Sequence, residues 1–106
     1  NKRAVYRQLV AEYRARAVSD PKDPEVRFAL GVFQSRFGDN LNAVENFEKA
    51  WALDHERFDA LFNLAVTAET LKDLPRARKA YKLLASLAAS DNAFRKAAEN
   101  WLERNR

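Results

Sequence analysis

Residues 24–53 read PEVRFALGVFQSRFGDNLNAVENFEKAWAL, and the fold of the chain follows from them. Their apolar side chains recur three and four positions apart on both sides of Gly38, which predicts two amphipathic helices. The dipeptide Asp23-Pro24 suits the start of the first helix, because aspartate caps free backbone N–H groups and proline is tolerated in a first turn. Gly38 suits the end of that helix, and Asp39 can cap the next one. The stretch therefore predicts a helical hairpin.

The same pattern returns further along the chain, at a constant spacing that carries Phe28 onto Phe62. Six residues are identical at this spacing, and they fall at inward or turn-forming positions of the predicted hairpin. Phe28, Leu30, Val32, Asp39, Ala43 and Leu53 correspond to Phe62, Leu64, Val66, Asp73, Ala77 and Leu87. A helix–turn–helix unit with a period of about 34 residues is typical of tetratricopeptide solenoids.

The chain resembles the tetratricopeptide repeat (TPR) family at the residues that form this family's signature. The first copy carries Leu30-Gly31, Gly38-Asp39, Ala43, Phe47, Ala50 and Leu53-Asp54, and the second carries Asn63-Leu64, Asp73, Ala77 and Tyr81. The second copy departs from the signature at Ala65, Lys72 and Leu84. The resemblance implies an all-α, right-handed superhelical solenoid of antiparallel helix pairs.

Composition agrees with an all-α chain of about six helices in one domain, residues 1–106. Its 106 residues suffice for one continuous core, and it has only two glycines and three prolines. We expect an N-terminal helix in 1–20, either a degenerate half-repeat or a cap, with repeats at 24–54 and 58–89 and a C-terminal capping helix at 91–104.

The sequence contains no apolar run near the roughly 20 residues that a membrane span requires. It begins with Asn1, so we interpret it as a piece of a longer protein from which a targeting segment can be missing. We expect a soluble protein and favour the cytoplasm, although a chain without cysteine folds equally well in other compartments.

The net charge of +4 is unevenly distributed. One basic cluster contains Lys2, Arg3, Arg7, Arg14 and Arg16, and another contains Lys72, Arg76, Arg78, Lys79 and Lys82. Charges of this kind usually form solvated helix faces. Contact with nucleic-acid phosphates is the alternative, and it requires these side chains to converge on one surface.

No catalytic or metal-binding pattern is present in the sequence. His55 is the single histidine, and the chain has neither a cysteine pair nor a glycine-rich phosphate loop. None of the serines is placed near a histidine in the helical pattern, as a serine nucleophile would need. We therefore predict a protein that is not an enzyme and that needs no cofactor or metal.

Most aromatic residues fall where neighbouring helices meet, which indicates core packing. Phe28 and Phe62 differ, because the resemblance places them on a concave groove that binds a partner. It implies that the groove is lined by Glu25, Phe28, Val32, Ser35 and Arg36 and by Asp59, Phe62, Asn63, Val66, Glu69 and Thr70. The alternative is that so short a stack buries Phe28 and Phe62 against its own helices.

The predicted groove has an apolar floor. Some family members bind acidic C-termini with a lysine and an asparagine in the first rung and a lysine and an arginine in the third. Those places are held here by Phe28, Val32, Ala93 and Ala97. We therefore expect a protein–protein interaction module, a scaffold or adaptor, whose partner is a peptide or an amphipathic helix. One alternative is self-assembly into a homo-oligomer through Val5, Leu9 or Trp101. Another is RNA binding through the basic helices, but no base-reading residues recur at the repeat spacing.

Overall fold

The computed structural model describes all 106 residues, and its regular structure consists of six α-helices with no strand. The helices are α1 (Lys2–Ser19), α2 (Pro24–Arg36), α3 (Asn40–Leu53), α4 (Phe58–Thr70), α5 (Leu74–Leu87) and α6 (Ala93–Arg104). The predicted all-α class and the predicted number of helices are confirmed.

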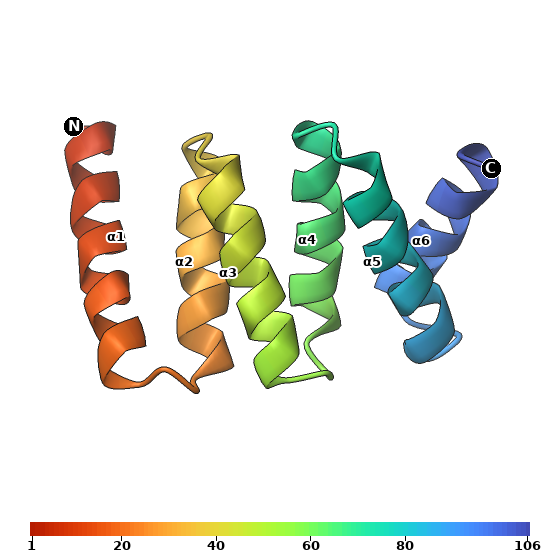
Figure 1. Ribbon diagram of the computed structural model, residues 1–106, viewed down its shortest axis with the longest axis horizontal. Helices are drawn as coiled ribbons and strands as arrows, with labels where there is room; N and C mark the ends of the chain where they lie inside the picture. Colours follow the sequence, from red (N-terminus) through yellow and green to blue (C-terminus); the bar gives the residue numbers. More distant parts are fainter.

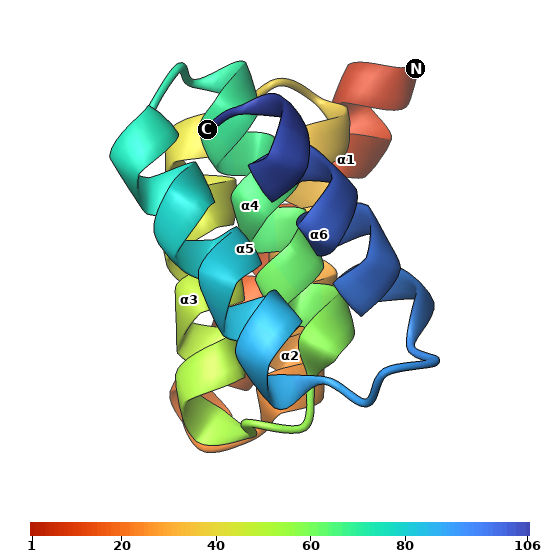
Figure 2. The ribbon, with the colours of Figure 1, turned by 90° about the vertical axis from the view of Figure 1, so that its right-hand side faces the viewer.

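The helices stand side by side in a row, with the two chain termini at opposite ends of the long axis (Figure 1). Each helix packs on its neighbours in the sequence, and α4 also contacts α6. The molecule measures 40 × 25 × 21 Å. Viewed along the row, α3 and α5 lie on one side and α6 on the other (Figure 2).

The helix bounds recur at the same spacing as the sequence pattern, the one that carries Phe28 onto Phe62. The starts of α2 and α4 (Pro24, Phe58) and their ends (Arg36, Thr70) have this spacing, as do the starts of α3 and α5 (Asn40, Leu74) and their ends (Leu53, Leu87). The ends of α1 and α6 fit it as well, since Ser19 lies one repeat before Leu53 and Arg104 one repeat after Thr70.

Both hairpin turns close with the same backbone hydrogen bonds. Asp39 N–H donates to the carbonyl of Gln34 (2.9 Å), and Asp73 N–H donates to that of Ala68 (2.9 Å). The residue before each aspartate is left-handed, with φ of 82° at Gly38 and 60° at Lys72. This is the Schellman ending, which satisfies carbonyls that the helix itself leaves free.

The side chains at the helix starts follow the sequence pattern with one exception. Asp23 accepts a hydrogen bond from Glu25 N–H (2.9 Å), and Asp73 accepts one from Arg76 N–H (3.2 Å). Asp39 was expected to cap the start of α3, but its side chain accepts no hydrogen bond from a backbone N–H group. Its carboxylate accepts instead from the side-chain amide of Asn42, at 2.9 and 3.1 Å.

The main hydrophobic core lies between α3, α4, α5 and α6. Its 13 buried residues come only from these helices and include Phe47, Leu61, Tyr81, Leu84 and Trp101. The first helix adds little to the interior, because only Val10 and Ala17 of α1 are buried. Edge-on packing of Tyr13 against Phe33 (5.0 Å between ring centroids) joins α1 to α2.

Candidate functional site

The predicted groove residues lie on α2 and α4. The exposed ones are Glu25, Arg36, Val66 and Thr70, whereas Phe28, Val32, Ser35, Asp59, Phe62, Asn63 and Glu69 are half-buried. Several polar members bond to their own helix: Ser35 Oγ donates to the Val32 carbonyl (3.0 Å), Asn63 Nδ2 to that of Asp59 (2.8 Å) and Thr70 Oγ1 to that of Val66 (3.2 Å).

Phe28 is covered by an arginine that the sequence analysis did not single out. The guanidinium of Arg57 lies 4.6 Å from the centre of the Phe28 ring. The same group makes ion pairs with Glu25 (2.6 Å) and Asp59 (3.0 Å), so it joins the start of α2 to the start of α4. Partial burial lowers the pKa of Arg57, but its bonds to Asp59 and Glu25 outweigh this effect and the pKa lies above its usual value.

Phe62 is covered by α6. Its ring centroid lies 5.1 Å from that of Phe94 and 6.4 Å from that of Tyr81. In the preceding hairpin, the ring centroid of Phe28 lies 5.8 Å from that of Phe47 in the core. The two phenylalanines therefore pack against the protein's own helices, as the alternative interpretation described, and only part of each ring is left to contact a partner.

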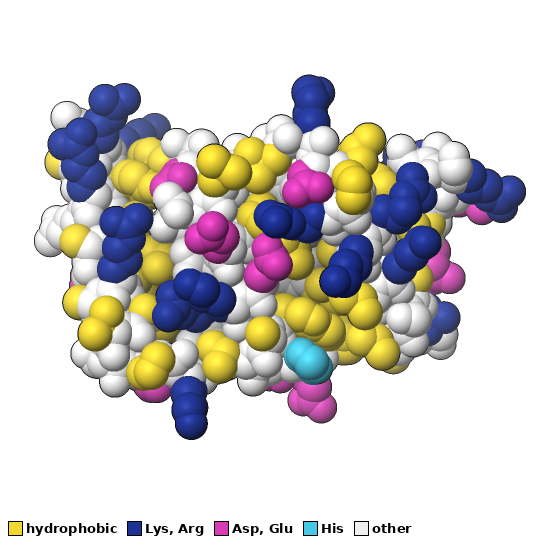
Figure 3. Space-filling model, in the orientation of Figure 1, with side chains coloured by type: hydrophobic (Ala, Val, Ile, Leu, Met, Phe, Trp, Pro, Cys, Tyr) yellow, Lys and Arg dark blue, Asp and Glu magenta, His cyan; other side chains and the backbone are white.

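The two basic clusters do not converge on one surface. The first lies on α1 and the second on α5 or at its start, and these helices are separated by α2, α3 and α4 along the row (Figures 1 and 3). Arg16 is paired with Glu12 (2.8 Å), and Arg76 with Glu48 (3.5 Å). The convergence that a phosphate-binding surface requires is therefore not found.

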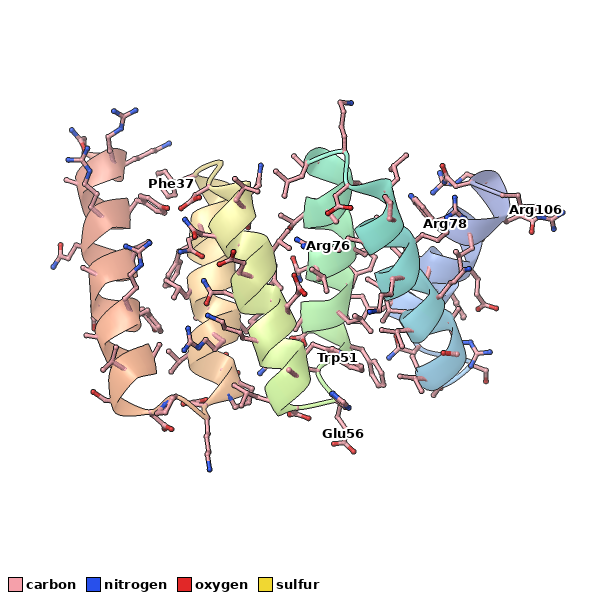
Figure 4. All side chains as sticks on the ribbon, in the orientation of Figure 1. Phe37, Trp51, Glu56, Arg76, Arg78 and Arg106 are labelled. Atoms are coloured by element: carbon pink, nitrogen blue, oxygen red, sulfur yellow. The ribbon has the colours of Figure 1, made fainter.

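A hollow that the sequence analysis missed lies between α3 and α5, with α4 beneath it. It measures about 260 Å³. Its apolar lining consists of Trp51, Ala52, Leu61, Leu64, Ala80 and Leu83, and its charged rim of Glu48, Arg76 and Lys79. We call it the α3–α5 groove. Figure 4 shows the side chains of Trp51 and Arg76 in the space between the two helices.

The remaining chemistry of the chain is limited. His55 stacks on Trp51, with ring centroids 4.7 Å apart and an interplanar angle of 17°, so its role here is packing. No group of three or more histidine, cysteine, aspartate or glutamate side chains is placed to hold a metal ion. None of the six helices has both the length and the apolar character needed to cross a membrane.

Comparison with known proteins does not identify a family. No protein-family model matches the sequence, and a search of curated proteins found no significant match.

Proposed function

We propose that this chain is a noncatalytic protein–protein interaction module built as a short TPR-like stack. The observation that carries the proposal is that every helix bound of the first hairpin recurs, at one constant spacing, in the second. In such a stack α2 with α3 and α4 with α5 are the two complete units. α1 then takes the place of the second helix of a preceding unit, and α6 that of the first helix of a following unit.

The proposed binding surface is the concave face formed by the first helices of the units, α2 and α4. Val66 is the most accessible apolar side chain of this face, with 38% of its surface exposed. Glu25, Arg36 and Thr70 add polar contacts at the surface. Because Phe28 and Phe62 are largely occupied by Arg57 and Phe94, we expect weak, transient binding of an extended peptide or a helix rather than a deep apolar pocket.

A peptide selection tests this proposal. Phage-displayed peptides are selected on the wild-type chain, and the enriched ones are measured by fluorescence anisotropy against Val66→Arg and against Leu41→Arg. Leu41 is 70% exposed and lies on α3, outside the proposed face, so its variant is the matched control.

We expect Val66→Arg to weaken binding at least tenfold, because a charge replaces an apolar contact, whereas Leu41→Arg leaves binding unchanged. If both variants bind as the wild type does, the concave face is not the binding surface. If no peptide is enriched, the chain is not a peptide-binding module.

Self-assembly is the second candidate, but not all of the residues expected to mediate it are exposed. Trp101 is buried and stacks on Tyr81 (4.6 Å between centroids), so it is not available to a second copy, and Leu9 is half-buried. Val5 is 54% exposed on α1 and remains accessible. A homo-oligomer through α1 predicts a concentration-dependent mass in sedimentation that Val5→Lys abolishes.

A further inference from the structure

The α3–α5 groove is apolar although the repeated architecture does not require it to be. The residues one repeat before Leu61 and Ala80 are Arg27 and Asn46. There, Arg27 donates to Asn46 Oδ1 (3.4 Å), and Asn46 Nδ2 donates to the buried Gln34 Oε1 (2.8 Å). One helix pair therefore accommodates polar side chains at the positions where the next has buried aliphatic side chains.

The walls of the groove also differ from the residues one repeat earlier. Trp51 and Leu83 correspond to Ala17 and Lys49, so the large apolar walls are particular to this location. Leu61 and Leu64 form a buried floor, while Ala52 is exposed at the rim. An aliphatic floor between larger apolar walls is suited to receive apolar side chains from another molecule.

The charged side chains beside the groove indicate the charge of the molecule that binds there. Arg76 is paired with Glu48 and Asp73, and Arg78 donates to the Asn105 carbonyl (2.6 Å). Lys79 and Lys82, one turn apart on the exposed side of α5, have no ion-pair partner in the structure. Figure 3, in the orientation of Figure 1, shows Lys and Arg side chains beside an apolar patch in the region of α3, α4 and α5.

We infer that the α3–α5 groove docks an acidic amphipathic helix of a partner protein. Its apolar side chains, spaced three or four residues apart, enter the hollow over Leu61 and Leu64. Its carboxylates pair with Lys79 and Lys82, which complement them in charge. This inference concerns a different face of the molecule and does not rest on the concave-face proposal.

The shape of the groove argues against other ligands. At about 260 Å³ it is smaller than the ~300–1,000 Å³ of most small-molecule pockets, so it suits side chains of a larger partner. RNA binding calls for exposed aromatic rings on which bases stack. Here Trp51 already stacks on His55, and Glu45 and Glu48 on α3 repel a phosphate backbone.

The probe for the test is a synthetic, fluorescein-labelled, alanine-based helical peptide. It carries leucines at positions i, i+4 and i+7 and glutamates along one flank of that apolar face. A second peptide has lysines in place of the glutamates. Binding to the whole chain is measured by fluorescence anisotropy, and circular dichroism checks the fold of every variant.

We expect the acidic peptide to bind at least tenfold more tightly than the basic one, and less tightly as salt increases. Ala52→Arg obstructs the rim without removing a core side chain and is expected to weaken binding at least tenfold. The pair Lys79→Glu and Lys82→Glu is expected to do the same. Lys96→Glu, a charge reversal on α6, is expected to leave binding unchanged.

Three outcomes overturn the inference. The first is the absence of saturable binding of the acidic peptide, or binding that Ala52→Arg does not weaken. The second is binding of single-stranded homopolymeric RNA to the chain. This RNA binding would have to be abolished by the Lys79 and Lys82 variants and not be displaced by the acidic peptide. The third is a concentration-dependent mass in sedimentation that Ala52→Arg abolishes, which identifies a second copy of the chain as the occupant.

Discussion

Gly31 is on α2, and the Phe47 ring of α3 occupies the space that a side chain at Gly31 would need. A Cβ built on Gly31 falls 2.7 Å from Cε1 and 2.8 Å from Cδ1 of Phe47, and the Phe47 ring is fully buried. The ring cannot move without disturbing the core around it. At this position glycine therefore allows the two helices to pack, at the expense of helix propensity.

Gly31→Ala is expected to destabilise the protein by about 1–3 kcal/mol through overpacking, even though alanine gains roughly 1 kcal/mol in helix propensity. Urea unfolding measures the change. The double variant Gly31→Ala, Phe47→Leu, which removes the ring edge, is the control and should lose less than the sum of the two single variants. A Gly31→Ala protein as stable as the wild type contradicts the close approach.

Tyr81 is the buried titratable group whose ionisation couples to folding. Burial raises the pKa of Tyr81 to about 12, and the Glu69 carboxylate acts in the same direction. The unfolded phenol titrates at ~10, so between these pH values the folded state holds the proton more tightly. The resulting stabilisation is intact below pH ~10 and is lost as the pH rises through the folded pKa of about 12.

Stability is therefore expected to fall more steeply with pH in the wild type than in Tyr81→Phe, which lacks the ionising group. Between pH 9 and pH 11 the wild type should lose about 1 kcal/mol more than the variant, once solvent screening is allowed for. Urea unfolding at both pH values measures the difference. Tyr6, whose pKa is also raised by burial, is present in both proteins and cancels. Equal losses refute the assignment to Tyr81.

Among the six helices, α1 is the least anchored. It buries only Val10 and Ala17 over 18 residues, whereas α4 buries six residues over 13. No residue of α1 belongs to the main core. Because local opening depends on the apolar contacts that must be broken, α1 should open well before α4.

Hydrogen exchange followed by NMR is expected to show amides of α1 at least tenfold less protected than those of α4. Tyr13→Ala removes the edge-on contact with Phe33 and should lower protection further in α1, with α4 unchanged. Uniform protection across the six helices contradicts this prediction.

The helices could be predicted from sequence because their signals are local. Asp23-Pro24 and Gly38 mark boundaries through capping, missing N–H groups and left-handed backbone, and the structure places helix ends there. The left-handed Lys72 carries no such signal by itself and is recognisable only because it matches Gly38 in the repeat. Asp39 shows the limit of the rule, since its carboxylate had a competing donor in Asn42.

The candidate sites were less predictable because they depend on contacts between distant residues. Arg57 covers Phe28 from the next hairpin, and Phe94 of α6 covers Phe62. Periodicity identifies the face on which a residue lies but not which later side chain occupies that face. The α3–α5 groove has a signal in the sequence, the change from Arg27 to Leu61 at matching positions, but its hollow exists only once α3 and α5 are placed in space.

In the molecule as a whole, the row of helices has one core and one end that contributes little to it. The main core joins α3 to α6 and α2 packs extensively on α3, whereas α1 attaches through a smaller set of contacts with α2. In a stack whose units contact only their neighbours, stability is a sum of unit and interface terms. Such a molecule should still fold when another helix pair is inserted in register with the repeat, whereas a fold with a closed core should not.

Duplicating residues 24–57 directly after residue 57 tests this property. The insertion keeps the α1–α2 and α3–α4 contacts and creates one new contact, between α3 and a second copy of α2. Val26, Leu30 and Phe28 of that copy take the places of Ala60, Leu64 and Phe62. Arg27 of the copy takes the place of Leu61 and has Asn46 of the same copy as its hydrogen-bond acceptor. In a repeating stack, small-angle scattering should show growth along the 40 Å axis with little change in the cross-section, and circular dichroism should show unchanged helicity per residue. A matched chain with the same segment inserted three residues out of register is expected to lose cooperative unfolding, and equal behaviour of the two insertions refutes the stack.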